Sequence, residues 1–298
     1  MKTVTSKDNP VLKAAAKLRT RKGREEAGAF LVEGKKMISE AANAGFATER
    51  VFINAGALAR GDVKAGECAK EIALARGDVK AGEYANEIAL AENLFVGLAE
   101  NLFVGLAGTR TPQPYIAVVK RQGDGSSVFS KTEEPSPCLK TKEPSPCLRA
   151  LVLDRVGDPG NVGAMMRSAL AAGFDALWCT KGTADVFSDK AVRASAGAIF
   201  RLPVLEGLSA EDCVGLAKDA GARLFTCRAG GTDIYETDLK GGIVLVIGNE
   251  GAGPQEVFLK EADGVIGIPM AGGAESLNAA AAAAIVMYEA GRQARAER

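Results

Sequence analysis

The sequence predicts an α/β protein whose C-terminal half builds a mainly parallel sheet, preceded by a smaller α/β domain. Three observations support this. Beyond residue 149, short apolar runs alternate with helical patterns. Glycine-rich turns follow three of those runs. Residues 121–148 are rich in Ser, Pro, Gly, Lys and Glu and hold few large apolar side chains, which is typical of a linker.

We therefore expect a small domain at 1–120, a linker at 121–148 and a second domain at 149–298. The 298 residues suffice for two cores, and 47% hydrophobic with 25% charged residues is an ordinary globular composition. Lys plus Arg equals Asp plus Glu, 37 each. A net charge of zero does not exclude a nucleic-acid partner, because the placement of charge matters more than its sum.

The small domain begins with a basic amphipathic pattern at 9–24, which predicts a helix. Short strands are expected at 29–32 and 51–53. Between them a helix is expected at 36–44, ended by Gly45 as a C-cap.

Tandem duplications follow. Three units occur twice each: LARGDVKAGE at 58–67 and 74–83, AENLFVGL at 91–98 and 99–106, and EPSPCL at 134–139 and 143–148. Two copies with unequal periods do not predict a solenoid, which needs at least three stacked units. We interpret 57–107 as a tandem-duplicated insert in a tolerant surface segment.

The second domain shows strand–helix alternation. Extended segments are expected at 150–153, 176–179, 201–205, 224–227, 243–247 and 264–268, and helices at 161–172, 189–198, 210–220 and 277–295. This order is typical of a parallel sheet, which binds ligands at the carboxyl ends of its strands.

Several function classes are excluded by composition. The chain has no histidine, so Ser-His-Asp catalysis and His-ligated metals are not expected. Its six cysteines form no C-x-x-C pair, which favours free thiols in a reducing compartment over a metal site. No apolar run is long enough for a membrane span, and the basic N-terminus lacks a secretory pattern. We expect a cytoplasmic protein without a metal.

Three glycine-rich turns stand where strands end and helices begin: DPGNVGAMMR at 158–167, IGNEGAGP at 247–254 and IPMAGGAESLN at 268–278. Glycine lets a backbone approach a ligand closely. None is G-x-G-x-x-G or a Walker motif, so Rossmann and P-loop sites are not predicted. Each turn alone has an ordinary structural explanation, but together they predict one composite pocket.

The second domain, over about 150–295, resembles the SpoU (TrmH) family of RNA 2′-O-ribose methyltransferases, of the SPOUT superfamily. The resemblance rests on NVGAMMR, FSDKAVRASAGAIFRLPV, LVIGNEGAGP and IPMAGGAESLNAAAAAAIVMYE, in that order. TSKDNPVLKAAAKLRTRKGREEAGAFLVEG resembles the family's small RNA-binding domain. TRTPQPYIAVV resembles that domain's end, with Pro114 and Tyr115 where a glycine is usual.

The resemblance implies a C-terminal trefoil knot, a homodimer with the site near the subunit interface, and S-adenosylmethionine as cofactor. The substrate it implies is a ribose 2′-hydroxyl, with ribosomal RNA favoured over transfer RNA. By the same resemblance, the cofactor would be held around Ile247, Gly248, Gly251, Ile268, Met270 and Leu277.

Arg167 is the expected activating residue. The resemblance makes it a general base, but a guanidinium keeps its proton to above about pH 12. The alternative is that Arg167 binds the target phosphate and stabilises the developing alkoxide. Otherwise it is an ordinary surface arginine.

Four further side chains are expected at the catalytic site. Asn161 would orient the arginine or the RNA, or cap its helix. Glu250 would pair with Arg167 or with substrate, or cap the next helix. Ser276 and Asn278 begin the last helix, where one of them should act as its cap. Ser195 is a weaker candidate for facing the same site.

In the small domain, basic side chains would contact RNA phosphates without reading sequence. They are Lys13, Lys17, Arg19, Arg21, Lys22 and Arg24. The alternative is a solvated helix face. For the whole protein, two other readings stay open: an RNA-binding protein of this fold without catalysis, and a different α/β enzyme that binds a nucleotide such as NAD.

Overall fold

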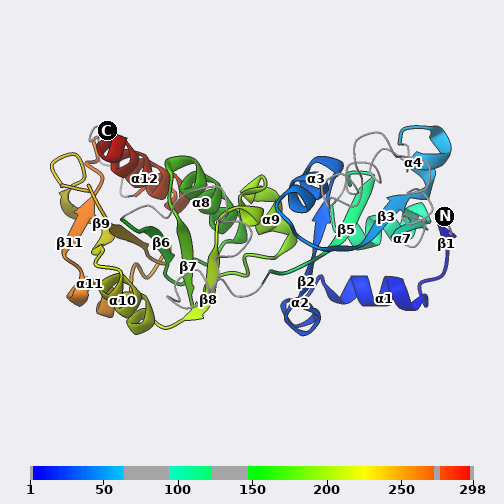
Figure 1. Ribbon diagram of the computed structural model, residues 1–298, viewed down its shortest axis with the longest axis horizontal. Coiled ribbons are helices and arrows are strands. Elements are labelled where there is room, and N and C mark those ends of the chain that lie inside the picture. The colour runs from blue at the N-terminus through cyan, green and yellow to red at the C-terminus, as the bar shows by residue number, and fades with distance from the viewer. Residues whose placement is uncertain (1–2, 64–93, 110, 123–146, 272–275, 296–298) are drawn as a thin grey trace. The chain divides into compact units, whose positions relative to one another are not determined.

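The computed structural model describes residues 3–63, 94–109, 111–122, 147–271 and 276–295 (Figure 1). The chain divides into two compact units. The first is Met1–Gln122 with Phe187–Arg193, and the second is Gly123–Val186 with Ala194–Arg298. Nearly all of the predicted linker and both copies of LARGDVKAGE beyond residue 63 lie outside the described residues.

The first unit is built on a mixed five-stranded sheet of order β1-β4-β3-β5-β2. Strand β4 runs parallel to β1 and β3, whereas β5 runs antiparallel to β3 and β2. The strands are β1 (Thr3–Val4), β2 (Ala29–Glu33), β3 (Thr48–Asn54), β4 (Phe95–Leu98) and β5 (Tyr115–Lys120). The predicted strands at 29–32 and 51–53 are confirmed as β2 and β3.

Helices α1 (Pro10–Lys17), α2 (Arg21–Ala27), α3 (Lys35–Asn43), α4 (Ala55–Arg60) and α7 (Glu100–Ala107) accompany this sheet. One buried cluster joins Leu12 of α1 and Phe103 of α7 to Phe52 and Ile116 of the sheet. Burying such side chains contributes about 1.5–3 kcal/mol each. The helix predicted at 36–44 is confirmed as α3.

The single helix predicted at 9–24 is wrong, because the chain breaks into α1 and α2. The side chain of Thr20 caps α2 by accepting from the Gly23 N–H at 3.1 Å. A Cβ on Gly23 would lie 2.0 Å from the Lys17 carbonyl oxygen, so only glycine permits this close turn. The helical spacing of apolar residues continues across the break, so the sequence pattern does not reveal it.

The interpretation of 57–107 as a surface insert is wrong for its described C-terminal part. Residues 95–98 form β4 inside the sheet, and residues 100–107 form α7. Leu98, Phe103 and Leu106 are each at most 2% exposed. The second AENLFVGL copy and the end of the first are therefore integral to the core.

The second unit is built on a six-stranded sheet of order β11-β9-β10-β6-β7-β8 in which every pairing is parallel. The strands are β6 (Arg149–Leu153), β7 (Ala176–Thr180), β8 (Val204–Leu208), β9 (Arg223–Asp233), β10 (Ile243–Ile247) and β11 (Gly264–Gly267). The predicted parallel α/β class is confirmed.

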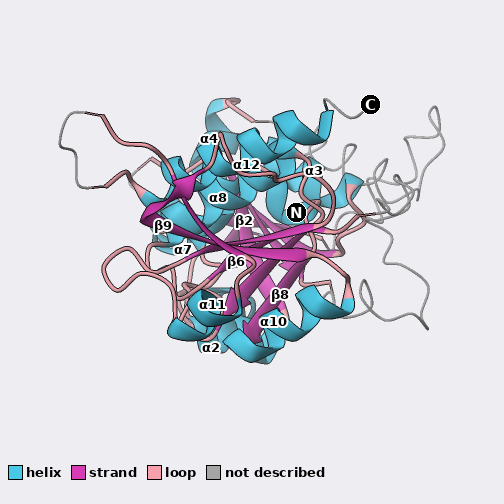
Figure 2. Cartoon of the chain, turned by 90° about the vertical axis from the view of Figure 1, so that its left-hand side faces the viewer, coloured by secondary structure: helices cyan, strands magenta, loops and turns pink. Residues whose placement is uncertain are grey.

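Helices cover both faces of this sheet, as Figures 1 and 2 show. One layer contains α8 (Pro159–Ala172) and α12 (Ala279–Arg295), which lie side by side, and the other contains α10 (Ala210–Asp219) and α11 (Glu256–Glu261). Successive strand residues face opposite layers. Val152 accordingly belongs to the cluster that includes Cys213 of α10 and Phe258 of α11.

Several boundaries differ from prediction. The extended segment expected at 201–205 begins only at 204, after a 3-10 turn at Ala198–Phe200, and α9 (Asp189–Ser195) ends before the predicted residue 198. The knot implied by the resemblance stays a prediction. Among the described residues, no helix has the length and hydropathy needed to cross a bilayer.

Candidate functional site

The three glycine-rich turns begin at the carboxyl ends of β6, β10 and β11. Because all six strands are parallel, these ends lie along one edge of the sheet. Strands β6 and β10 are direct neighbours, with Leu153 paired to Ile247. The turns after them, 154–158 and 248–255, are therefore placed side by side by the sheet itself.

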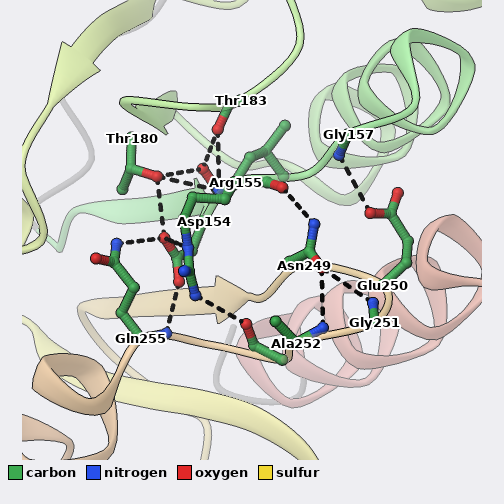
Figure 3. A network of polar contacts seen from close by, with 12 residues as sticks. Asp154, Arg155, Gly157, Thr180, Thr183, Asn249, Glu250, Gly251, Ala252 and Gln255 are labelled. Carbon is green, nitrogen blue, oxygen red and sulfur yellow. Dashed lines mark hydrogen bonds and ion pairs between the residues drawn. The ribbon is translucent and has the colours of Figure 1, made fainter.

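A chain of hydrogen bonds joins all three turns. The Asn278 side-chain amide donates to Asn161 Oδ1 at 3.2 Å. The Asn161 amide in turn donates to Glu250 Oε1 at 3.0 Å. The other oxygen, Glu250 Oε2, accepts from the Gly157 N–H at 3.1 Å (Figure 3). Three predicted site residues, up to 117 positions apart, are thus in direct contact.

Glu250 is held in its ionised form. Burial by itself would raise the pKa of this carboxyl. The hydrogen bonds from Asn161 and from the backbone around Gly157 and Asp158 outweigh it, and the pKa lies below its ordinary value. A carboxylate before the N-terminus of α8 also suits the positive end of the helix dipole.

Asn249 shapes the turn that carries Glu250. Its Oδ1 accepts from the N–H groups of Gly251 at 3.0 Å and Ala252 at 2.9 Å. Its Nδ2 donates to the Arg155 carbonyl at 2.9 Å, which links this turn to the end of β6 (Figure 3). A Cβ on Gly248 would lie 2.1 Å from the backbone nitrogen of Pro254, so this turn closes on itself only with glycine there.

Asp154 stands beneath these turns and is fully buried. Its Oδ1 accepts from Thr180 Oγ1 at 3.0 Å and from Gln255 Nε2 at 2.6 Å. Its Oδ2 accepts from the Gln255 backbone N–H at 2.7 Å. Figure 3 shows this carboxylate at the centre of the network. It fastens the ends of β6 and β7 to the start of α11.

Arg167 lies on α8 and is exposed. Within the described part of the chain, its guanidinium forms no hydrogen bond or ion pair, so Glu250 does not pair with Arg167, which was one of its three predicted roles. Asn161 is not the helix cap. Helix α8 begins two residues earlier than predicted, and its N-cap is Asp158, whose side chain accepts from the Asn161 N–H at 2.9 Å.

The start of the last helix is as expected. Asn278 Oδ1 accepts from the N–H groups of Ala280 at 2.9 Å and Ala281 at 3.2 Å, so this side chain is the cap. Ser276 is exposed. Ser195 is fully buried, and it therefore presents no surface to a ligand.

Two of the predicted cofactor residues are unusual in their exposure. Met270 is 38% and Leu277 is 39% exposed, which places both among the exposed large hydrophobic side chains. They flank the turn after β11, whereas Ile247 is buried within β10. Apolar side chains left in water at a strand end form a surface that an apolar ligand group would cover favourably.

The basic residues of the first unit divide into two groups. Lys13 and Lys17 are exposed on α1, Lys13 with an ion pair to Asp8 at 2.7 Å. On α2, Arg21 pairs with Glu25. Lys22 likewise lies 3.7 Å from Glu26. Such exposed pairs contribute little to stability.

Arg19 and Arg24 are engaged within the fold. Arg19 Nη1 donates to the Gly105 carbonyl at 2.6 Å. Arg24 is only 4% exposed and donates to the Leu18 carbonyl at 2.7 Å. The prediction that Arg24 contacts phosphate is wrong, because the side chain is buried. Its guanidinium instead stabilises the junction between α1 and α2.

Sequence reasoning missed Asp154, Asn249 and Gln255 as parts of the site. Asp154 could have been found from the sequence, because it is an acidic residue that directly follows a predicted buried strand. Its partners Thr180 and Gln255 come from 26 and 101 positions away, so no local pattern reveals them. Among the described residues, no cluster of carboxylates and thiols is suited to hold a metal.

Comparison with known families matches both units. Residues 149–288 match the SpoU rRNA Methylase family, and residues 9–117 match the MRM3-like substrate binding domain. The chain is 30% identical over 290 residues to the 23S rRNA (guanosine(2553)-2′-O)-methyltransferase RlmP of Bacillus subtilis, covering 97% of this chain and 98% of that protein.

Solved structures of RNA methyltransferases are also similar to this chain. An AdoMet-bound rRNA methyltransferase from Sinorhizobium meliloti superposes with a TM-score of 0.75 at 27% identity, covering 98% of this chain and 97% of that one. The SpoU methyltransferase AviRb from Streptomyces viridochromogenes gives a TM-score of 0.75 at 27% identity, covering 97% and 99%. The chain therefore belongs to the SpoU rRNA methylase family.

Proposed function

We propose that this protein transfers the methyl group of S-adenosylmethionine to a ribose 2′-hydroxyl of ribosomal RNA. The observation that carries the proposal is the contact between Asn161, Glu250 and Asn278, which joins the three glycine-rich turns at the start of the helix that also carries Arg167. Family membership and the rRNA 2′-O-methyltransferase activity in the name of the Bacillus relative support it. The relative that matches over its full length is named for 23S rRNA, which favours ribosomal RNA over the transfer RNA alternative.

The site suits the cofactor. Met270 and Leu277 offer exposed apolar side chains, and the turn at Gly248 closes so tightly on Pro254 that only glycine fits there. The residues we propose for holding the cofactor are Ile247, Gly248, Gly251, Ile268, Met270 and Leu277. When bound, the cofactor would supply an electrophilic methyl group to the ribose O2′ and leave as the thioether, and the hydroxyl proton would pass to water.

Arg167 binds and orients the RNA in this proposal. Its cationic side chain is exposed and uncommitted, so it can bind the phosphate next to the target ribose. The same charge stabilises the oxyanion that develops as the hydroxyl loses its proton. Positioning of this kind supplies up to about 7–11 kcal/mol in the best intramolecular models. We favour this role over that of a general base.

Asn161, Glu250 and Asn278 keep the surrounding surface rigid. The Asn161 amide is fixed on both sides, since its Nδ2 donates to Glu250 and its Oδ1 accepts from Asn278. Ser276, exposed beside Asn278, is free to contact the ribose. Substitution of any of the three amide and carboxylate groups would leave a donor or acceptor without its partner.

We further propose that residues 1–120 bind RNA and that 149–298 carry out catalysis, across the linker at 121–148. Lys13, Lys17, Arg21 and Lys22 would contact phosphates. The family resemblance implies a homodimer, which light scattering after size-exclusion chromatography tests. Ribosomal RNA as substrate fits a cytoplasmic protein, as does the lack of a disulfide among the four cysteines that the structure describes.

Methyl incorporation from labelled S-adenosylmethionine tests the proposal, with separate ribosomal and transfer RNA fractions as substrates. Arg167→Ala should abolish transfer and leave cofactor affinity within a few-fold of wild type. Lys218→Ala, which removes an exposed cation of α10, is the matched control and should be fully active. Transfer by the Arg167 variant at the wild-type rate would refute the assignment of Arg167. No cofactor binding by the wild type would refute the function.

A further inference from the structure

Arg155 has an unusual backbone. Its φ is +58°, in the left-handed region that favours glycine, and it shares this only with Ala196 among the described residues other than glycine. It follows Asp154 directly, at the carboxyl end of β6. A conformation of this kind costs free energy and persists only where the surroundings fix it.

The backbone of Arg155 is fixed from three directions. Its N–H lies 3.1 Å from both Thr180 Oγ1, at the end of β7, and Thr183 Oγ1, in the turn after β7. Its carbonyl accepts from Asn249 Nδ2 at 2.9 Å. Figure 3 shows these groups converging on one residue. The ends of β6, β7 and β10 therefore meet at this residue.

The side chain adds a direct link to the turn after β10. Arg155 Nη2 donates to the Gly253 carbonyl at 3.3 Å, and its Nε lies 3.4 Å from Asp154 Oδ1. Gly182 makes room for it, because a Cβ there would lie 3.3 Å from Arg155 Cγ. The side chain is 37% exposed, so it spans the turn at the surface of the site.

Glycine would adopt this φ without cost, so the guanidinium contacts are what an arginine adds at this position. We infer that Arg155 is a positioning residue: by binding the Gly253 carbonyl it holds the 249–253 turn in the shape that receives the cofactor. This rests on the proposed function, in which Gly248 and Gly251 of that turn hold S-adenosylmethionine.

Arg155→Gly tests the inference because glycine tolerates the backbone conformation while the guanidinium is removed. The melting temperature should not fall. Amide hydrogen exchange at Gly251 and Ala252, measured without cofactor, should become at least about 5-fold faster. The reason is that their hydrogen bonds to Asn249 Oδ1 open more often once the 249–253 turn loosens. The dissociation constant for S-adenosylmethionine, by calorimetry, should rise about 10-fold, equivalent to about 1.4 kcal/mol. Affinity for RNA alone should be unchanged.

Arg155→Asn is the second variant, since asparagine also tolerates the left-handed region, and it should behave like the glycine variant. Arg223→Ala is the matched control. That arginine also donates to a carbonyl, that of Lys240 at 2.7 Å, and pairs with Asp238, but at the opposite end of the sheet. It should leave both exchange in the turn and cofactor affinity unchanged.

Wild-type exchange and affinity in both Arg155 variants would overturn the inference. So would a general loss of stability with no selective change in the 249–253 turn, because that marks an ordinary structural role. If the wild-type protein binds no S-adenosylmethionine, the proposed function fails, and the exchange rates alone then decide whether Arg155 holds the turn.

Discussion

Replacing Asp154 by asparagine should destabilise the second unit strongly. The Asp154 carboxylate is fully buried and accepts three hydrogen bonds, two at Oδ1 and one at Oδ2. Asparagine keeps the shape but can accept at only one of these oxygens. If its oxygen stays with Thr180 and the Gln255 side chain, its amide faces the Gln255 backbone N–H, which loses its acceptor, while the new amide N–H finds none. Each costs about 1–3 kcal/mol.

Part of that cost is offset because a charge is no longer buried, so we expect a net loss of about 2–4 kcal/mol. For a domain of this size the melting temperature should fall by about 4–16 °C. The assay is fluorescence-monitored urea unfolding. The chain has one tryptophan, Trp178, which is fully buried on β7 and therefore reports on the second unit.

Asp263→Asn is the control for this substitution. Asp263 accepts from a single backbone N–H, that of Leu224 at 2.7 Å, and is exposed, so asparagine can turn its oxygen to the same donor. Its effect should stay within about 0.5 kcal/mol. If Asp154→Asn unfolds at the wild-type urea concentration, or if both variants shift equally, the network around Asp154 does not hold these strand ends together.

Two further predictions concern the turn after β10. Because the pKa of Glu250 lies below its ordinary value in the folded protein, its contribution to stability is present above about pH 4.3 and is lost as pH falls through the lowered value. The urea midpoints of wild type and Glu250→Gln should therefore converge on acidification, and a constant gap would contradict this. Gly248→Ala should cost about 1–3 kcal/mol and weaken cofactor binding, since its Cβ would meet the backbone of Pro254 at 2.1 Å. Gly251→Ala, with nothing nearer than 3.7 Å, should be as stable as wild type by the same unfolding assay.

Much of the second unit was predictable because its local signals agree with one another. The buried strand at 243–247 matches its prediction, and α8 ends at Gly173 as predicted. The three turns were predicted to form one pocket, and Asn161, Glu250 and Asn278 do meet. The catalytic roles of these residues stay predictions.

What could not be predicted depends on partners distant in sequence. The buried Asp154 is explained only by Thr180 and Gln255, and the φ of Arg155 only by the turn at Asn249. In the sequence, Arg24 looks like one more basic residue of the exposed helix face predicted at 9–24. In the structure, the break between α1 and α2 buries it.

The duplicated octapeptide AENLFVGL shows most clearly what local sequence determines and what only tertiary contacts determine. Periodicity, glycine turns and capping residues determined the α/β class, the parallel sheet and the edge at which the turns meet, because these signals are local. The two identical copies have identical local propensities, yet FVGL is strand β4 at 95–98 and part of helix α7 at 103–106. Only the tertiary structure decided this: the first copy pairs with β1 and β3, while the second buries Leu102, Phe103 and Leu106 in the core. Burial and pairing outweigh propensities of a few tenths of a kcal/mol per residue, roughly the range of the helix scale.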